Sequence, residues 1–223
     1  MQISLSDTGK RFNRDWIFRN LSFRFSPGNF YAITGPNGSG KSTLLQAIAG
    51  SVTLSEGKVE YKNPAPVDPE RAFRHLSIAA PYQELIEEMT LLEFLAFHNK
   101  FKPLLPGFSL PEIVRTIGLE HAARKQIRYY SSGMKQRVKL AQAIFSDTSC
   151  LLLDEPCTNF DAEGMALYHR LIAGHCSDRL VIVSSNEPQE YRFCNEIIDI
   201  TRYKGTAAYQ VQTTEKNAAA DNR

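Results

Sequence analysis

Nine residues constrain this chain more than any others. Positions 35–43 read Gly-Pro-Asn-Gly-Ser-Gly-Lys-Ser-Thr and fill every fixed position of the pattern G-x-x-x-x-G-K-[ST]. The apolar run 30–33 precedes them, and Leu44, Leu45 and Ile48 follow at helical spacing. Glycines permit turns that aim successive backbone N–H groups inward, at the positive end of the following helix. The sequence therefore predicts a strand, an oligophosphate-binding loop and a helix.

Each loop residue is a candidate nucleotide contact: Gly35, Pro36, Asn37, Gly38, Ser39, Gly40, Lys41, Ser42 and Thr43. We expect Lys41 to lie on an exposed loop end and to reach the β- and γ-phosphates. The Ser42 hydroxyl is a predicted ligand of Mg²⁺, which prefers hard oxygen donors in octahedral geometry. A chance glycine-rich turn is the alternative, and the flanking strand and helix patterns argue against it.

A second segment, 150–155, is a short apolar run that ends in two carboxylates. The run Cys-Leu-Leu-Leu is typical of a strand buried on both faces of a parallel sheet. Asp154 is expected to hold Mg²⁺, directly or through water, and Glu155 to polarise an attacking water. Taken alone, the pair is equally well explained as two solvated charges at a strand end.

A third segment, 129–137, reads Tyr-Tyr-Ser-Ser-Gly-Met-Lys-Gln-Arg and precedes a helical pattern, with Ser131 as the expected N-cap. It resembles the signature motif of ATP-binding cassette (ABC) ATPases, usually Leu-Ser-Gly-Gly-Gln. Ser131 and Gly133 match the motif, and Tyr130, Ser132 and Met134 depart from its commonest residues. A serine at a helix N-terminus is a second phosphate-binding device.

The resemblance covers residues 1 to about 205, with the motifs in the family's order. It implies an α/β fold: a P-loop NTPase core with a mainly parallel sheet, an N-terminal antiparallel β subdomain and an inserted helical subdomain. It also implies a head-to-tail dimer, either a homodimer or a heterodimer. ATP would lie between the phosphate loop of one subunit and the Ser131–Gly133 segment of the other.

The same resemblance implies roles for three further positions. Gln83 matches the family's glutamine loop, which senses Mg²⁺ and the attacking water. Phe12 lies where the family places an aromatic ring that stacks on adenine, and Trp16 is the alternative. Either residue could instead be an ordinary core or surface aromatic. Asp161 is retained from the loop that usually reads Ser-Ala-Leu-Asp, whose aspartate communicates across the dimer.

One departure bears on mechanism. After the expected strand 180–184 the family presents Thr-His, whereas this chain has Ser185 and Asn186. An Asn amide can hydrogen-bond the γ-phosphate, but it cannot carry a proton as His can. We expect either slow turnover or a greater dependence on Glu155.

The resemblance and the patterns together divide the chain into one ABC ATPase domain at 1–212 and a polar tail at 213–223. The helical subdomain is expected at about 84–145. Sequences 90–93 and 109–112 both fit capping boxes within it, and Gly118 fits a helix stop.

Composition excludes several classes. A net charge of +2 is too small to argue for nucleic acid, and no stretch approaches the ~20 apolar residues that span a bilayer. The first residues begin a polar alternating strand rather than a secretion signal, so a cytosolic protein is expected. Buried thiols are the expected state of all four cysteines: Cys150, Cys157, Cys176 and Cys194.

The leading hypothesis is an ATPase subunit that binds ATP and Mg²⁺ and drives separately encoded integral membrane subunits from the cytoplasmic face. In the family, a groove beside the glutamine loop receives a helix of the membrane partner, which points to 83–97 here. The apolar side chains of that range are mostly expected in the subdomain core. Two alternatives remain: a non-transport ABC ATPase, disfavoured by the absence of tandem cassettes or zinc-type cysteines, and a poorly hydrolysing regulatory subunit, suggested by Asn186.

Overall fold

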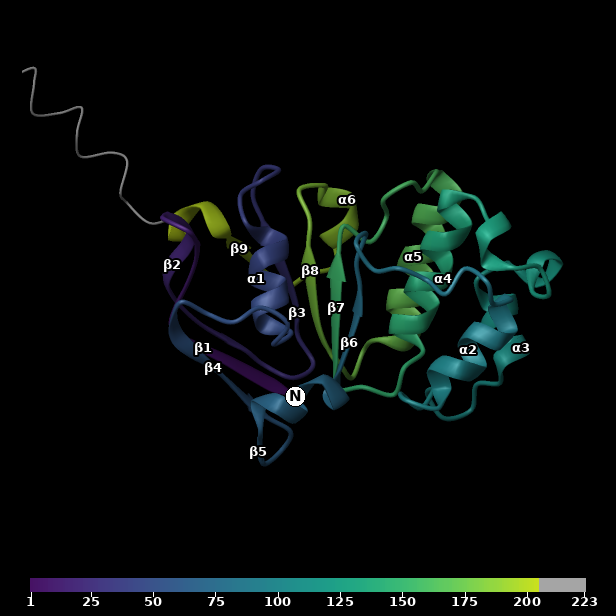
Figure 1. Ribbon diagram of the computed structural model, residues 1–223, viewed down its shortest axis with the longest axis horizontal. Coiled ribbons are helices and arrows are strands. Elements are labelled where there is room, and N and C mark those ends of the chain that lie inside the picture. The colour runs from purple at the N-terminus through teal and green to yellow at the C-terminus, as the bar shows by residue number, and fades with distance from the viewer. Residues whose placement is uncertain (205–223) are drawn as a thin grey trace, which may run out of the picture.

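A five-stranded sheet forms the centre of the computed structural model, which describes residues 1–204. Its order is β6-β7-β8-β3-β9, and all neighbouring strands are parallel. The strands are β3 (Phe30–Thr34), β6 (Leu76–Ala79), β7 (Cys150–Asp154), β8 (Leu180–Ser184) and β9 (Glu196–Asp199). Because parallel strands end at the same edge, the segments that follow β3, β7 and β8 gather there (Figure 1).

Strands β7 and β8 contribute to two hydrophobic cores at once. Alternate β7 residues Cys150 and Leu152 face one core, and Leu151 and Leu153 face the other. Every residue of both strands is buried. A strand with period-two side chains and two covered faces reads as a continuous apolar run, which confirms the interpretation of this segment from sequence.

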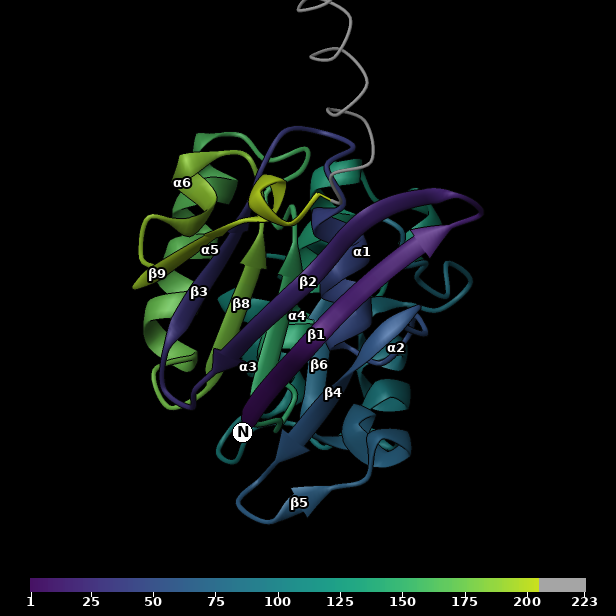
Figure 2. The same cartoon turned by 90° about the vertical axis from the view of Figure 1, so that its left-hand side faces the viewer.

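One face of the parallel sheet is covered by an antiparallel sheet and by helix α1 (Lys41–Ile48). This second sheet has the order β2-β1-β4-β5, formed by β1 (Gln2–Phe12), β2 (Asp15–Phe25), β4 (Glu56–Lys62) and β5 (Pro66–Val67). Figure 2 shows β1, β2 and β4 passing in front of the parallel strands. Short 3₁₀ turns at Pro69–His75 and Ile200–Tyr203 complete this side.

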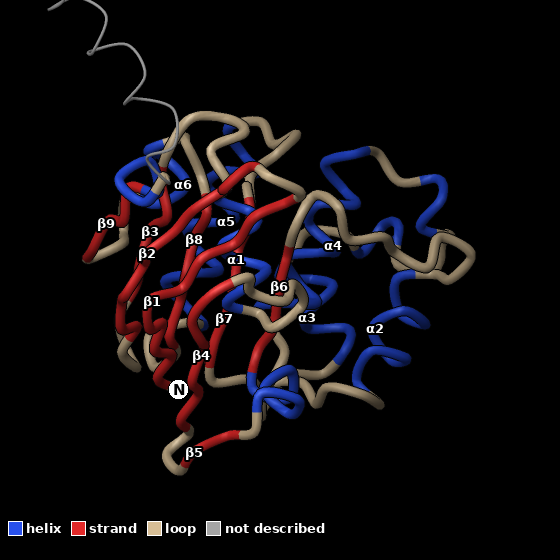
Figure 3. Tube along the Cα trace, turned by 60° about the vertical axis from the view of Figure 1, so that its left-hand side comes forward, coloured by secondary structure: helices blue, strands red, loops and turns tan. Residues whose placement is uncertain are grey.

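Helices cover the other face. They are α2 (Leu91–Asn99), α3 (Leu110–Thr116), α4 (Ser132–Ile144) and α5 (Ala162–His175), with 3₁₀ turns at Glu120–Ala122 and Ile127–Tyr129. Helix α6 (Pro188–Tyr191) follows β8. In Figures 1 and 3, α2 and α3 lie at the end of the molecule opposite the antiparallel sheet, beyond α4.

The expected fold class is confirmed, including its antiparallel sheet and its helical insertion. Both predicted capping boxes are present: Thr90 with Glu93, and Ser109 with Glu112. Gly118 has the left-handed φ of +70° that a helix stop requires. Residues 205–223, which include the predicted tail and the end of the predicted domain, lie outside the described residues.

Two further expectations can be compared with the structure. Three cysteines are buried free thiols, and Cys194 is only half-buried.

In the range proposed as a partner groove, Leu91, Phe94 and Leu95 are core residues, as expected, whereas Phe97 is exposed. No helix among residues 1–204 combines the length and the apolar character needed to cross a bilayer.

A histidine links the helical insertion to α4. His98 Nε2 lies 2.8 Å from Ser146 Oγ, and Gln142 Nε2 lies 3.3 Å from His98 Nδ1. Since the Ser146 hydroxyl donates to the Gln142 carbonyl at 2.6 Å, it accepts from Nε2, which leaves Nδ1 unprotonated. Burial, with a smaller contribution from the nearby Lys102 charge, lowers the pKa of His98 to about 4. The network therefore requires a neutral imidazole.

This arrangement predicts acid sensitivity. Between pH 6.5 and about 4 the unfolded chain binds a proton at His98 that the folded chain does not, so folded stability decreases as pH falls through that window. After discounting for solvent screening, the free energy of unfolding falls by about 1–2 kcal/mol across this window. His98→Gln keeps hydrogen-bonding capacity without the titration and should flatten this part of the curve. Urea unfolding of both proteins from pH 4 to 8 measures it, and parallel curves would contradict the assignment.

Candidate nucleotide-binding site

Three segments meet at the carboxyl edge of the parallel sheet: the loop after β3, the turn after β7 and the segment after β8. Backbone hydrogen bonds hold them together. Glu155 N donates to Ser184 O at 2.8 Å, and Ser185 N donates to Ile33 O at 3.1 Å. A crevice outside the carboxyl ends of strands is the usual ligand site of an open α/β sheet. The sequence motifs on β3 and β7 are therefore brought to one place.

The phosphate-loop motif forms the predicted strand–loop–helix. Gly40, the N-cap of α1, has φ +104°, and a Cβ there would approach Ile17 Cγ2 to 2.3 Å. Gly38 has φ +74°. Glycine is required at position 40 for both conformation and space, because L side chains rarely adopt such φ values.

Lys41 differs from expectation, because it is buried and not exposed. Its ammonium group donates to the carbonyls of Gly35 at 2.9 Å and Pro36 at 3.3 Å. The loop curls around the lysine, so that backbone oxygens satisfy the charge. The sequence prediction placed Lys41 on an exposed loop end, because the motif does not show which groups accept hydrogen bonds from its ammonium.

A hollow of about 220 Å³ lies at the loop. Glu155 contributes to it from the β7 turn, and the remaining lining residues come from the phosphate loop: Asn37, Gly38, Gly40, Lys41, Ser42 and Thr43. The structure thus places the candidate water-activating carboxylate beside the candidate phosphate cradle. Residues more than 110 positions apart in sequence meet here because β7 and β3 lie in one sheet, with β8 between them.

Asp154 is almost completely buried, and its Oδ1 has no hydrogen-bond partner among residues 1–204. Burial raises the pKa of Asp154, whereas the Ser42 and Ser184 hydroxyls and the Lys41 ammonium oppose that shift. A buried carboxylate oxygen left unpaired beside a serine hydroxyl is costly unless a cation is held there. Carboxylate and hydroxyl oxygens are the donors that Mg²⁺ prefers, so these residues fit that ion.

A second hollow, of about 360 Å³, adjoins the first, since Asn37 and Glu155 line both. It also contains Asn186 and Glu190. The structure therefore brings Asn186 and Glu155 to the same hollow. Glu190 was not anticipated.

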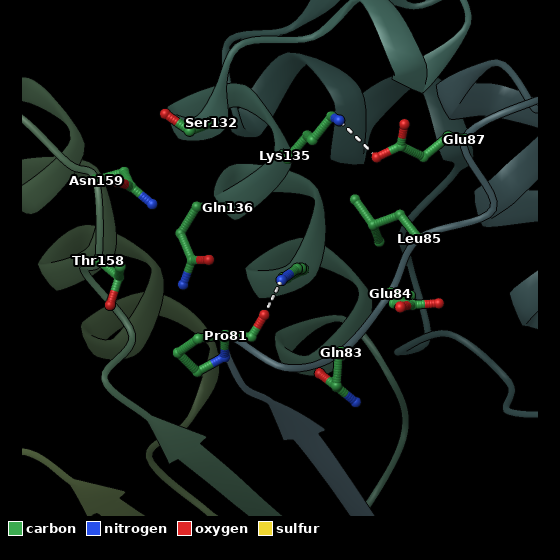
Figure 4. A pocket seen from close by; sticks show the side chains of 11 residues that line it. Pro81, Gln83, Glu84, Leu85, Glu87, Ser132, Lys135, Gln136, Thr158 and Asn159 are labelled. Atoms are coloured by element: carbon green, nitrogen blue, oxygen red, sulfur yellow. Dashed lines mark hydrogen bonds and ion pairs between the residues drawn. The ribbon is translucent and has the colours of Figure 1, made fainter.

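Gln83 faces a different space. Together with residues of α4, it lines a groove of about 470 Å³ (Figure 4). Its Oε1 accepts the Ala80 N–H at 3.1 Å, so the side chain is folded onto its own loop. Lys139 of α4 secures the loop by donating to Pro81 O at 2.7 Å. Gln83 does not line the phosphate-loop hollow in this conformation.

The signature segment forms the predicted helix start. Ser131 Oγ, at the N-cap of α4, accepts the Met134 N–H at 3.3 Å. Ser131 and Gly133 line a hollow of about 370 Å³ together with Asp161, the N-cap of α5. Its lining residues within the described chain differ entirely from those of the phosphate-loop hollow. One chain therefore presents two separate candidate phosphate-binding sites.

The two aromatic candidates for adenine differ in accessibility. Phe12 is 50% exposed at the end of β1, with the Lys10 ammonium 4.7 Å from its ring centroid. Trp16 is half-buried, and the Arg19 guanidinium covers it at 4.5 Å. Phe12 thus offers the freer ring face.

A model of the ABC transporter family matches residues 18–158, which include the phosphate loop, Gln83, the signature segment and the Asp154–Glu155 turn. The chain belongs to the ABC transporter family.

Curated relatives of this ABC cassette include the uncharacterized ATP-binding protein YybJ of Bacillus subtilis, 32% identical over 76% of this chain and 78% of the relative. The cytochrome c biogenesis ATP-binding export protein CcmA of Agrobacterium fabrum is 29% identical over 84% and 90% of the two chains. A putative ABC transporter ATP-binding protein from Pyrococcus furiosus superposes with a TM-score of 0.77 at 19% identity, over 92% of this chain and 100% of that one. A dimeric bacterial ABC transporter cassette superposes with a TM-score of 0.74 at 24% identity, over 89% of this chain and 94% of that one.

Sequence reasoning missed two side chains of this ABC cassette that contact the Glu155 turn. Gln136 of α4 donates to Pro156 O at 2.7 Å, and Glu190 of α6 accepts the Cys157 N–H at 2.9 Å. Gln136 lay in the quoted signature segment but received no role. Glu190 lies only four residues after Asn186, in the segment that follows the expected strand 180–184.

The geometry of Gly40 generates a prediction. Gly40→Ala should lower ATP affinity at least about tenfold, because the methyl group displaces Ile17 and forces the loop to change conformation. Gly107→Ala is the matched control: its φ of +85° imposes the same backbone strain, but the new Cβ meets no described atom within 4 Å. It should cost ~1 kcal/mol of stability and leave affinity unchanged. Titration with a fluorescent ATP analogue measures both, and equal affinities would refute the steric argument.

Proposed function

We propose that this chain is the ATP-binding and ATP-hydrolysing subunit of an ABC transporter, and that dimer closure around ATP drives separate membrane subunits. The observation that carries the proposal is the shared hollow of the phosphate loop and Glu155. A cradle for β- and γ-phosphates beside a carboxylate is the arrangement that hydrolysis of a phosphoanhydride needs.

ATP binds through the loop after β3. Backbone N–H groups at positions 35–43 and the positive end of α1 contact the phosphates. Lys41 exchanges its two carbonyl partners for β- and γ-phosphate oxygens. Phe12 stacks on adenine through its exposed face.

Ser42 and Asp154 would hold Mg²⁺, and Gln83 would join them when its loop moves toward the site. When bound, the ion would supply a positive charge that stabilises negative charge in the transition state. The unpaired Asp154 Oδ1 supports this assignment.

Hydrolysis uses groups of the chain itself. Glu155 accepts the proton of the attacking water, and the Asn186 amide donates to the γ-phosphate. Lys41 stabilises the charge on the transferring group. Proton acceptance rests on Glu155, because Asn186 cannot take a proton.

A second subunit completes each site. Ser131 and Gly133 lie away from their own phosphate loop, which supports a head-to-tail dimer in which they bind the partner's γ-phosphate. Asp161 borders the same hollow, and we assign it to communication between the two nucleotide sites of the dimer. Neither a homodimer nor a heterodimer is preferred by this geometry.

The membrane partner docks within 83–97, where Gln83, Leu85 and Glu87 line the groove and Phe97 is exposed further along the chain. This places the subunit on the cytoplasmic face of the membrane. Gln83 lines the groove, and movement of its loop toward the Mg²⁺ site would link docking of the partner to hydrolysis.

The test of this proposal is Glu155→Gln. The variant should bind ATP but hydrolyse it at least about a hundredfold more slowly, so that the sandwich dimer accumulates. Light scattering with and without Mg-ATP measures the dimer. Lys41→Ala is the control, since it loses phosphate contacts and should stay monomeric under the same conditions. A Glu155→Gln protein that binds ATP and remains monomeric contradicts the dimer or the role of Glu155.

Asn186 distinguishes a hydrolytic subunit from an attenuated one. If its amide only holds the γ-phosphate and water, Asn186→Ala should lower kcat about tenfold or more with little change in KM. We expect this outcome, because Asn186 and Glu155 line one hollow. Steady-state kinetics of Asn186→Ala and Asn186→His at several pH values decide the matter. A several-fold gain for His with no loss for Ala would mark the subunit as attenuated.

A further inference from the structure

We propose that Glu190 is a positioning residue for ATP hydrolysis: its buried carboxyl group holds the turn that aims Glu155 at the phosphate site. The inference rests on the proposed function, because it concerns the catalytic carboxylate of that same site. Glu190 lies on α6 and Glu155 on the turn after β7, and both border the hollow that contains Asn186.

The Glu155 turn has a backbone conformation that does not persist unaided. Glu155 has φ +43°, in the left-handed region that L residues rarely occupy. It also precedes Pro156, whose ring further restricts the backbone of the preceding residue. Such conformations survive only where surrounding contacts over-determine them. The turn therefore depends on the groups that bind it.

Hydrogen bonds within the turn and to β8, α4 and α6 hold it in place. Thr158 closes it locally, with its N–H and Oγ1 both donating to Glu155 O at 3.2 and 2.8 Å. Gln136 of α4 donates to Pro156 O, and Glu190 Oε1 accepts the Cys157 N–H at 2.9 Å. Within residues 1–204, Glu190 Oε1 is the only acceptor of the Cys157 N–H. Loss of its oxygen would leave the Cys157 N–H buried and unpaired.

The environment of Glu190 shows that it is not a solvated surface acid. The residue is 4% exposed, and the Tyr168 hydroxyl anchors its backbone carbonyl at 2.8 Å. Burial raises the pKa of Glu190; the Ser185 hydroxyl and the Cys157 N–H oppose the shift, and the negative charges of Glu155 and Glu187 add to it. A carboxyl group kept in such surroundings is costly, and its bond to the turn is the compensation that the structure provides.

The bond also joins two catalytic segments. Asn186 precedes α6 in the same segment as Glu190, so a contact from α6 to the Glu155 turn fixes Asn186 and Glu155 relative to one another. Their relative placement decides whether the water faces the γ-phosphate and the base together. Small displacements of positioned groups have large effects on rate and small effects on substrate binding. This predicts a loss in kcat rather than in affinity.

Two substitutions at this position separate positioning from stability. Glu190→Gln keeps an Oε1 acceptor for the Cys157 N–H and should retain kcat within about twofold. Glu190→Met keeps the volume without an acceptor and should lower kcat about tenfold, with KM for ATP within about twofold. Arg192→Gln, an exposed change at the end of the same helix, serves as control. Equal kcat for the folded Glu190→Met and Glu190→Gln proteins, or a rise in KM without a fall in kcat, would overturn the proposal.

A double-mutant cycle tests whether Glu190 acts through Glu155. If it does, Glu190→Met should change the residual single-turnover rate of Glu155→Gln by less than about twofold. The same tenfold loss in both backgrounds would show an independent role and refute the positioning argument. If the wild-type protein binds ATP without hydrolysing it, the proposed function fails first, and the next measurement still tests Glu190.

Hydrogen exchange provides a readout that does not require turnover. Without nucleotide, a peptide covering 155–160 should exchange faster in Glu190→Met than in the wild type, because the Cys157 amide loses its acceptor. Glu190→Gln should match the wild type, and peptides of α4 should be unchanged in both. Unchanged exchange at 155–160 in Glu190→Met would overturn the proposal whatever the ATPase rates are.

Discussion

The complete burial of β7 and β8 is the constraint on which the rest of this cassette depends. Both strands lack a solvent-facing side, so a second sheet with α1 must cover one face and the helices α4 and α5 the other. Polar groups are then admitted only where the strands end. Asp154, Glu155 and Asn186 occupy those ends, and the loop after β3 lies beside them. The site is thus a consequence of how the core is closed.

Much of the fold could be predicted because local chemistry determines it. The phosphate loop, the buried strand 150–154, the Ser131 N-cap and the two capping boxes each depend on residues a few positions apart. The family resemblance supplied the arrangement of the two sheets and the helical insertion, which periodicity alone does not give. Parallel strand order depends on contacts between distant segments that carry no local signal.

The site was predicted less completely, for a related reason. Lys41 was expected on an exposed loop end, yet the loop carbonyls enclose it. Gln83 was expected near the metal, yet it is bonded to its own loop in this conformation. Gln136 and Glu190 were given no role, although they bind the backbone around Glu155. In each case the deciding partner is a main-chain group, and main-chain groups look the same in every sequence.

The enclosure of Lys41 has a consequence for the working cycle of such a subunit. An ammonium that already has two carbonyl partners gains only the difference between those bonds and its bonds to phosphate when a nucleotide arrives. Under the proposed function that exchange would reduce binding strength, and the same two hydrogen bonds fix the loop around the Lys41 ammonium. Departure of the product restores the same internal pairing. Under the proposed function, the Gly35 and Pro36 carbonyls would therefore compete with the product for Lys41 and favour its release.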